Sequence, residues 1–479
     1  MDLRYLPIIY VRGYAGNQGL VESTVDLPYY GFNLGSTKIR TGADGDPEFR
    51  IFESPLVRLI RDHGYTDYFA RVEDGNVNVL RGASDGDVEL RSLWIFRYYD
   101  QTSRITGDGS RDPIEELAGD LGRLIEHVIR RSGAPRVHLV AHSMGGLICR
   151  SLIQRHLKDR AVERVDRLFT YGTPHGGIHF RTGLGFAAKL RDALGINDAD
   201  TFGPRRMRQY LGFDSDRDAN RLHEITHFPA NKVFSLIGTN HEDYNLARLA
   251  VGPRSDGLVK MEHAYVRNSS RAFVFRAHSG PLGMVNSDEG YQNLQRFLFG
   301  DTSVEIALED VRLKAELRDN EELAHLLLET QVVIRGEEVT MTDQREEDGS
   351  AIRTTPAALE DGRETLFRVF LMRGLRPETR ERYSFFQVRL RILPIYVRER
   401  RVVRDRQFAG EHLFADTLTI GIRDEDNGPG RLIRAGWGSL ESDAPRQGTR
   451  QTDDVISIPL KGRHIEEGEL TLRIRDETE

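Results

Sequence analysis

The chain has 479 residues, 39% of them hydrophobic and 29% charged, a balance typical of a globular protein with a buried core. This length exceeds what one core usually supports, so we expect two domains. The net charge of −7 gives no reason to expect a nucleic-acid partner, and a single cysteine excludes both an intrachain disulfide and a cysteine metal cage.

The amino-terminal residues favour a cytoplasmic protein. Leu6–Val11 is predicted to be a core strand, and no basic stretch, apolar run and cleavage site of a secretory signal precede it. No stretch of about 18 uninterrupted apolar residues occurs, so we expect no transmembrane segment, although peripheral contact with a membrane stays open. The lone thiol, Cys149, fits a reducing compartment.

Short apolar runs alternate with helix-like stretches over the first 300 residues. This alternation predicts a mostly parallel sheet with helices on both faces. Two irregular stretches, about residues 17–87 and 178–230, read as cap or lid insertions over the sheet edge. The expected strands are Leu6–Val11, Leu93–Tyr98, Val137–Val140, Leu168–Tyr171, Val233–Ile237 and Ala272–Phe275, and the clearest helical patterns are Ile114–Ile129, Leu147–Leu157 and Ser287–Gly300.

The pattern changes near Gly300, where apolar residues begin to recur at every second position. Half-buried antiparallel strands with one solvated face produce this period. Residues 301–479 are therefore predicted to form an all-β, sandwich-like domain, with a loop or poorly ordered segment at Glu346–Asp361. The alternation is clearest at Phe386–Ile392, Leu418–Ile422 and Leu470–Ile474.

The stretch Arg136–Gly146 carries the candidate nucleophile. It reads as an apolar strand, a small-x-Ser-x-Gly turn and then a helix. A nucleophilic serine on such a sharp turn needs small residues two positions to either side, because the backbone there is crowded. Ala141 and Gly145 supply them, and the helix N-terminus beside the serine favours negative charge. We therefore predict that Ser143 is a nucleophile.

A glycine-containing loop, Arg12–Gly16, directly follows the first predicted strand. Acyl transfer needs two backbone donors aimed at the developing oxyanion, and losing one typically costs about 2.7–4 kcal/mol of barrier. We assign one donor to the N–H of Tyr14, in this loop, and the other to Met144, the residue after the serine. An ordinary glycine turn is the alternative reading of the loop.

The acid and the base are expected after the nucleophile, in the order Ser, Asp, His. Asp256 follows the strand predicted at Val233–Ile237, and His278 follows the strand predicted at Ala272–Phe275. Both loops fall at the end of the sheet where Ser143 emerges. In these roles the imidazole accepts the serine proton, and the carboxylate holds the imidazole in the correct tautomer.

Other residues of the same types compete for both roles. Asp256 is also suited to cap a turn with Gly257. His142 and His175 read as structural or pocket-lining, because neither stands with carboxylates at metal-ligand spacing. We expect neither a metal nor a cofactor. The competing candidates are Asp243, Glu242 and Glu262 for the acid, and His263 and His241 for the base.

Four motifs in this order resemble those of the lipase and esterase branch of the α/β-hydrolases, which includes bacterial triacylglycerol lipases and related acyltransferases. The resemblance covers about residues 5–300 and implies ester hydrolysis through an acyl-enzyme, with the triad and oxyanion donors named above. Arg12 departs from the usual histidine of that branch; a backbone donor does not depend on it. The motifs are Arg12–Gly16, Ala141–Gly146, Tyr171–Gly177, and Asp256–Val259 followed by His278.

The leading interpretation is thus a serine hydrolase acting on a small-molecule or lipid ester. An acyltransferase or thioesterase with the same triad is the first alternative, and a non-catalytic binding protein on this fold is the second. The β domain is a candidate contact for lipid headgroups, a protein partner or a second subunit. Its basic run Arg398–Arg406 is a candidate for anionic lipid, but Glu399 and Asp405 interrupt the run and favour a solvated strand or loop with mixed charges. A lid or fixed cap helix is suggested by Phe186, Leu190, Ala193 and Leu194.

Overall fold

The computed structural model divides the chain into two compact units. The N-terminal unit comprises Met1–Arg271 and Phe275–Leu298, and the C-terminal unit comprises Ala272–Val274 and Phe299–Glu479. The structure describes residues 4–15, 17–41, 46–81, 88–178, 199–213, 221–244, 251–318, 322–336, 339–372, 375, 383–398, 406–424, 431–438, 449–451 and 455–477.

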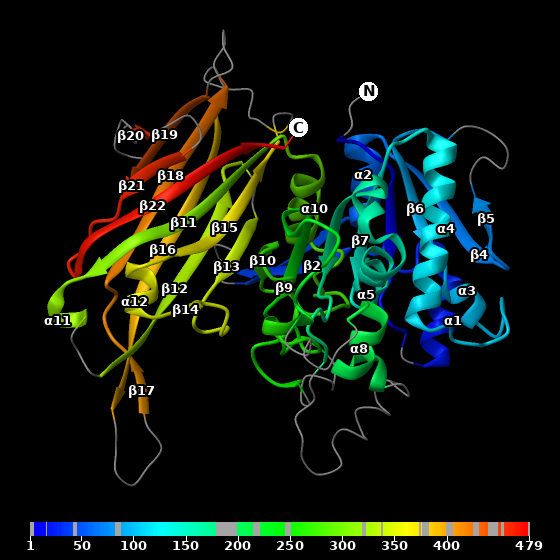
Figure 1. The fold of residues 1–479 in the computed structure, drawn as a ribbon, viewed down its shortest axis with the longest axis horizontal. Coiled ribbons are helices and arrows are strands. Elements are labelled where there is room, and N and C mark those ends of the chain that lie inside the picture. The colour runs from blue at the N-terminus through cyan, green and yellow to red at the C-terminus, as the bar shows by residue number, and fades with distance from the viewer. Residues whose placement is uncertain are drawn as a thin grey trace. The chain divides into compact units, whose positions relative to one another are not determined.

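An eight-stranded sheet forms the core of the N-terminal unit (Figure 1). Five pairs of neighbouring strands are parallel, and the edge pair β4–β5 is antiparallel. Strands β1 and β6 are buried along their whole length, as expected for a parallel sheet covered on both faces. The predicted mostly parallel sheet is confirmed. Its strands, in spatial order, are β10 (Ser270–Val274), β9 (Val233–Gly238), β8 (Val165–Tyr171), β7 (Val137–His142), β1 (Ile8–Val11), β6 (Ser92–Phe96), β4 (Thr66–Glu73) and β5 (Asn76–Arg81).

Helices α4 and α5 lie side by side against this sheet (Figure 1). Leu117, Leu121, Leu124 and Val128 give α4 a buried apolar face at helical spacing. The helix ends at Gly133, whose left-handed φ of 66° suits a glycine. The helices among the described residues of this unit are α1 (Gln18–Asp26), α2 (Pro55–His63), α3 (Tyr99–Thr102), α4 (Ile114–Ser132), α5 (Met144–Ser151), η1 (Leu152–Leu157), η2 (Lys158–Arg160), α6 (Ala161–Arg164), η3 (Ala199–Phe202), α8 (Pro204–Leu211), η5 (Ala230–Lys232), η6 (Met261–His263) and α10 (Asp288–Phe299).

In the part of the C-terminal unit that the structure describes, two antiparallel sheets are accompanied by the short helices α11 (Ala315–Arg318) and α12 (Pro356–Glu360). Alternate residues of β16, from Phe386 to Ile392, are fully buried, so the period read from the sequence corresponds to one apolar face. One sheet has the order β15 (Arg363–Leu371), β11 (Thr302–Leu313), β22 (Ile465–Asp476), β21 (Val455–Pro459), β20 (Thr449–Gln451). The other has the order β13 (Thr340–Gln344), β12 (Leu323–Ile334), β16 (Ser384–Arg398), β18 (Phe414–Asp424), β19 (Arg431–Trp437), with β14 (Ile352–Thr354) on β12 and β17 (Arg406–Ala409) on β16.

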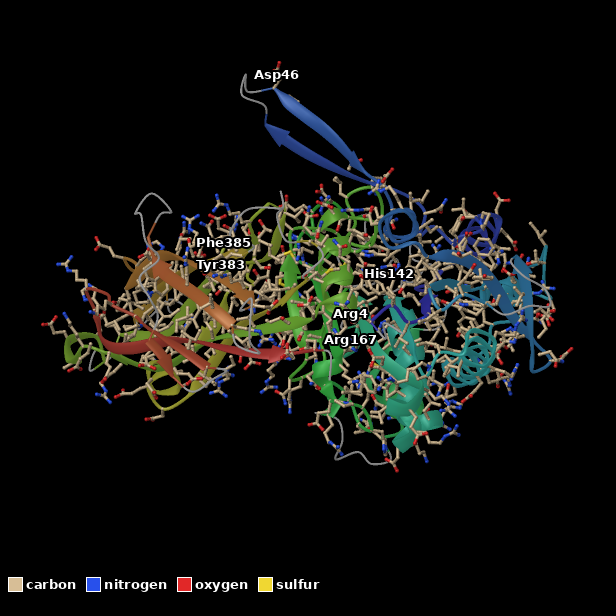
Figure 2. All side chains as sticks on the ribbon, turned by 90° about the horizontal axis from the view of Figure 1, so that it is seen from above. Arg4, Asp46, His142, Arg167, Tyr383 and Phe385 are labelled. Atoms are coloured by element: carbon tan, nitrogen blue, oxygen red, sulfur yellow. The ribbon has the colours of Figure 1, made fainter. Side chains whose placement is uncertain are left out.

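Two stretches are more ordered than the sequence suggested. Residues 17–87, read as an irregular insertion, include β4 and β5 of the main sheet. They also form the hairpin of β2 (Ser36–Thr41) and β3 (Pro47–Phe52), which projects from the rest of the unit with Asp46 at its tip (Figure 2). Residues 346–361, read as a loop, contain β14 and α12, because Thr355 caps a helix whose first residue is Pro356.

Some predictions fall outside the described residues. The proposed lid residues Phe186, Leu190, Ala193 and Leu194 belong to the undescribed stretch 179–198, and 399–405 of the basic run are likewise undescribed. Within the described part of the chain, no helix combines the length and the apolar character needed to cross a membrane.

Candidate active site

Ser143 lies at the junction of β7 and α5, in a strained turn. Its backbone has φ 52° and ψ −123°, a conformation that costs a non-glycine residue of order 1–3 kcal/mol. Two hydrogen bonds hold the turn. The Ser143 N–H donates to the Tyr171 carbonyl at 2.9 Å, and the Thr173 hydroxyl donates to the Ser143 carbonyl at 2.9 Å. The turn directs the serine side chain out of the end of the sheet, as the small-x-Ser-x-Gly pattern predicts.

The structure brings the three predicted residues Ser143, His278 and Asp256 into one hydrogen-bonded series. His278 Nε2 lies 3.1 Å from Ser143 Oγ, and His278 Nδ1 lies 2.7 Å from Asp256 Oδ2. The three residues are only 4%, 2% and 1% exposed. An ionised carboxylate can only accept a hydrogen bond, so Nδ1 of neutral His278 must carry the proton and donate it to Asp256. Nε2 is then free to accept the serine proton.

Asp256 is held by backbone donors as well as by the imidazole. Its Oδ1 accepts hydrogen bonds from the N–H groups of Leu258 and Val259 at 3.0 and 2.7 Å, and its carbonyl accepts from the His278 N–H at 2.9 Å. Gly172, with φ 51°, packs against this pair: a Cβ here would lie 2.9 Å from Asp256 Oδ2 and 3.0 Å from His278 Nδ1. Glycine in the Tyr171–Gly177 motif therefore leaves room for the acid and the base.

The competing candidates lie in other surroundings. The Asp243 carboxylate accepts a hydrogen bond from Asn240 Nδ2 at 2.5 Å. Glu242 is exposed, as is Glu262, whose side chain is 65% accessible and lies 3.9 Å from His263 Nε2. The His263 ring stacks on His223. His241 is half-buried. Among the predicted acids, the geometry therefore favours Asp256.

Two aromatic rings flank the imidazole of His278. His142 Nε2 lies 3.1 Å from the His278 carbonyl, and the two rings are 4.8 Å apart. Burial, with the charges of His278 and Arg12, holds the pKa of His142 well below its ordinary value. Tyr244 meets the His278 ring edge-on at 5.6 Å, and burial raises the pKa of Tyr244 to about 12. Both rings are thus neutral at pH 7; the sequence analysis did not single out Tyr244.

The loop after β1 approaches the nucleophile closely at Gly13. A Cβ at this position would lie 2.8 Å from Ser143 Cβ and 2.9 Å from His142 Nδ1, so only glycine permits the approach. Tyr14 follows directly, and Met144 is the first residue of α5. The first N–H groups of a helix have no acceptor within the helix and favour negative charge. Both predicted oxyanion donors therefore belong to backbone segments that meet at Ser143.

Two tyrosine hydroxyls that the sequence analysis missed hold this loop. Tyr98 Oη donates to the Arg12 carbonyl at 2.8 Å, and Tyr99 Oη donates to the Gly13 carbonyl at 3.1 Å. The Ala15 N–H donates to Tyr99 Oη at 2.7 Å. Burial raises the pKa of both tyrosines, which keeps them protonated. The only sequence signal was their position at the end of the strand predicted at Leu93–Tyr98.

Arg12, which departs from the resembled motif, has a structural partner. Its Nη1 donates to the Tyr30 carbonyl at 2.5 Å, and Tyr30 Oη donates to Asp100 Oδ1 at 2.6 Å. Arg97 pairs with the same carboxylate at 3.0 Å. The guanidinium of Arg12 therefore anchors the loop from outside and leaves its backbone donors unaltered.

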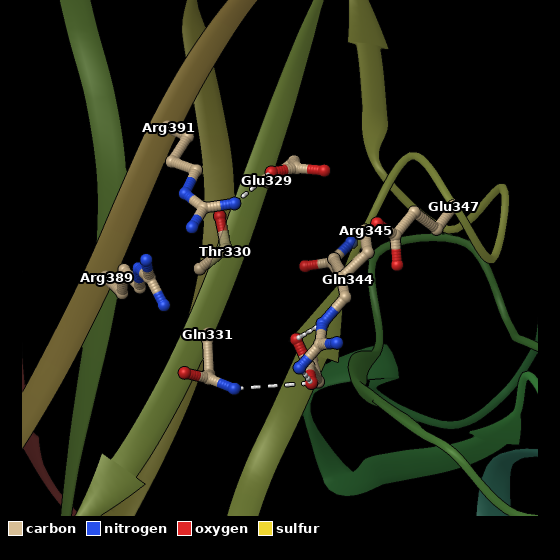
Figure 3. A pocket seen from close by; sticks show the side chains of 9 residues that line it. Glu329, Thr330, Gln331, Gln344, Arg345, Glu347, Arg389 and Arg391 are labelled. Carbon is tan, nitrogen blue, oxygen red and sulfur yellow. Dashed lines mark hydrogen bonds and ion pairs between the residues drawn. The ribbon is translucent and has the colours of Figure 1, made fainter. Parts of the chain in front are cut away.

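The C-terminal unit has a polar hollow of about 160 Å³ across β12, β13 and β16 (Figure 3). Two of its pairs bond across the strands, Arg391 with Glu329 at 3.3 Å and Gln331 with Asp343 at 3.3 Å, and Arg345 also pairs with Asp343 at 2.6 Å. Such cross-strand pairs are typical of the solvated face of an antiparallel sheet. Among the described residues, no group of three or more His, Cys, Asp or Glu side chains is placed to hold a metal ion.

A protein-family comparison agrees with this architecture. Residues 95–245, which span the strand, turn and helix around Ser143, match the family described as the alpha/beta hydrolase fold. The N-terminal unit has the α/β-hydrolase fold. The match supports a hydrolase as the class of the N-terminal unit. No curated protein matches the sequence.

Solved structures similar to this α/β-hydrolase are distant. A Listeria innocua gene product is 14% identical with a TM-score of 0.35, over 61% of this chain and 93% of its own. Bacillus licheniformis lipase BlEst2 is 14% identical with a TM-score of 0.28, over 57% and 85%. Legionella pneumophila phospholipase PlaB is 12% identical with a TM-score of 0.35, over 85% and 89%. Identities and scores this low do not assign an activity.

Proposed function

We propose that this α/β-hydrolase cleaves carboxylic esters through an acyl-enzyme on Ser143. One observation carries the proposal: the buried series Asp256–His278–Ser143, with contacts of 2.7 and 3.1 Å. The resemblance to lipases and esterases in four ordered motifs supports the ester as the substrate. We infer a small-molecule or lipid ester as the substrate, and a reaction that uses the chain's own side chains and backbone N–H groups together with water.

In the first half of the reaction, the Ser143 oxygen attacks the ester carbonyl carbon while its proton passes to His278 Nε2. Asp256 stabilises the imidazolium that forms. The carbonyl oxygen becomes an oxyanion and accepts hydrogen bonds from the N–H groups of Met144 and Tyr14. The carbon–oxygen bond to the alcohol then breaks, and His278 returns the proton to the leaving alkoxide, so the alcohol departs and the acyl group stays on Ser143.

In the second half, water takes the place of the alcohol. His278 Nε2 accepts a water proton as the water oxygen attacks the acyl carbon, and the same two backbone donors hold the oxyanion. Collapse releases the carboxylic acid, and Ser143 recovers its proton from His278. Another alcohol or a thiol in place of water would make the same site an acyltransferase, so the acceptor separates the two activities.

The experiment is hydrolysis of p-nitrophenyl esters by the full chain and by Ser143→Ala. The matched control is Ser151→Ala, which removes another buried serine hydroxyl from α5. We expect Ser143→Ala to remove nearly all turnover and Ser151→Ala to retain it. Product analysis with added alcohols and thiols identifies the acceptor. Turnover that persists in Ser143→Ala would contradict the proposal, and dominant acyl transfer would replace the hydrolase by a transferase.

A further inference from the structure

A cavity of about 170 Å³ adjoins the two residues assigned as oxyanion donors. It lies among the loop after β1, α3, the start of α4, η3 and α8. Tyr14 and Met144 both line it, whereas Ser143 and His278 do not. Tyr99, Leu117, Arg206 and Tyr210 also line it.

The position of this cavity fits the acyl side of an ester rather than the alcohol side. The alcohol must leave next to His278 Nε2, which returns its proton. The carbonyl oxygen must face the N–H groups of Tyr14 and Met144. A cavity that touches both donors and not the histidine therefore receives the group attached to the carbonyl carbon on the side away from the leaving alcohol.

Three polar side chains in the cavity wall have partners inside the protein. Tyr99 Oη bonds to the loop as described above, and Tyr210 Oη donates to the Thr201 carbonyl at 3.1 Å. Both guanidinium nitrogens of Arg206 bond to the Glu115 carboxylate at 2.6 and 2.7 Å. What these residues offer a ligand is their ring faces and carbon stems, which suit an alkyl chain.

Two further charged residues line the cavity and argue against an anionic acyl group. Arg111 donates to the Ala15 carbonyl at 2.6 Å, and its guanidinium lies 4.9 Å from the centre of the Tyr14 ring. Asp112 has its pKa raised by burial and by the nearby carboxylates of Glu116 and Asp120, among others. Arg111 and Arg206 are thus both engaged with partners inside the protein, and the Asp112 carboxylate disfavours a second negative charge.

The volume of the cavity limits the length of the acyl chain that it can hold. An apolar cavity of about 150 Å³ accommodates one benzene molecule, which has six carbons. We propose that this cavity binds the acyl group and restricts the hydrolase to esters of short, uncharged acids of about four to six carbons. The inference rests on the proposed function and adds the substrate class to it.

The test is kcat/KM for p-nitrophenyl esters of acids from two to twelve carbons, in the full chain. Each methylene that enters the cavity should raise kcat/KM about fourfold. The profile should therefore peak at butyrate or hexanoate and fall at least about tenfold by decanoate. A profile that peaks at ten or more carbons would overturn the inference. The inference would also be overturned if, in a series of alkyl acetates, kcat/KM were limited by the length of the alcohol instead of the length of the acyl group.

Three variants of α4 test whether this cavity sets the limit on acyl chain length. Leu117→Ala enlarges the cavity and should move the peak two or three carbons longer, whereas Leu117→Phe fills it and should move the peak toward acetate. Leu124→Ala is the matched control, because Leu124 is a buried leucine of the same helix that does not line the cavity; its peak should not move. An unmoved peak in folded Leu117→Ala or Leu117→Phe would overturn the assignment.

The two proposals fail in different ways. If no ester of any length is cleaved and fluorophosphonate does not label Ser143, the proposed function fails. If esters are cleaved through Ser143 but with a long-chain peak, only the cavity assignment fails. Succinate and glutarate half-esters add a separate check, since preference for an anionic acyl group over butyrate would contradict the reading of Arg111 and Asp112.

Discussion

Asp256→Asn probes how the acid orients the base. In the protein, Asp256 Oδ1 accepts from the N–H groups of Leu258 and Val259, and Oδ2 accepts from His278 Nδ1. An asparagine must keep its one carbonyl oxygen toward the two backbone donors, so its NH₂ group faces Nδ1. His278 Nδ1 then becomes the acceptor and the proton moves to Nε2, where it prevents Ser143 from giving up its own proton.

The wrong tautomer of a catalytic histidine lowers kcat by about 10⁴ in serine hydrolases, which corresponds to about 5.5 kcal/mol of barrier. We expect a loss of this order for Asp256→Asn on p-nitrophenyl butyrate, with KM changed little and the unfolding transition retained. Asp243→Asn is the control, because Asp243 bonds to Asn240 and not to His278. The reasoning is refuted if Asp256→Asn keeps more than about a tenth of the activity, or if Asp243→Asn loses more than Asp256→Asn.

Three further predictions concern residues around the site. Tyr99→Phe leaves the buried Ala15 N–H without its acceptor, which should destabilise the loop by about 1–3 kcal/mol. In steady-state kinetics we expect kcat to fall while KM stays nearly constant. An unchanged kcat would contradict the role given to the loop. Arg150→Met removes the guanidinium that bonds three backbone carbonyls, two of them in buried hydrogen bonds, so urea unfolding should show a loss of about 3–5 kcal/mol in the free energy of unfolding. A variant as stable as the parent would show that these bonds contribute nothing net. Burial lowers the pKa of His138 to about 4 despite the nearby Asp166 carboxylate, so the unfolded chain takes up this proton at a higher pH than the folded chain does. The free energy of unfolding should therefore be unaffected by His138 above pH 6.5 and fall by about 3 kcal/mol as the pH drops to 4. His138→Gln should flatten this decline in urea midpoints measured at pH 7 and 4.5, and an equally steep decline would contradict the prediction.

Local pattern was enough to predict the meeting of Ser143, Asp256 and His278. Each follows the end of a short apolar strand, and the carboxyl ends of parallel strands share one edge of a sheet. The glycine and proline signals that mark these loops are also local. Sequence patterns of a few residues therefore located the candidate site without knowledge of the strand order.

What the sequence did not reveal depends on long-range pairing. Tyr98 and Tyr99 reach the loop at Gly13 only because β6 lies parallel to β1, some 85 positions away in the chain. Strands β4 and β5 join the main sheet through the pairing of β4 with β6, which their own residues do not specify. The helix α12 did carry a local signal, Thr355 before Pro356, but five residues are too few for helical periodicity.

The central claim is that Ser143 is a nucleophile activated by His278. Treating the folded chain with a fluorophosphonate and locating the label by peptide mass spectrometry tests it most directly. The account predicts a label on the peptide that contains Ser143, lost in Ser143→Ala and slowed at least about a thousandfold in His278→Ala. A folded chain that takes up no label, or one labelled at another residue, would contradict it.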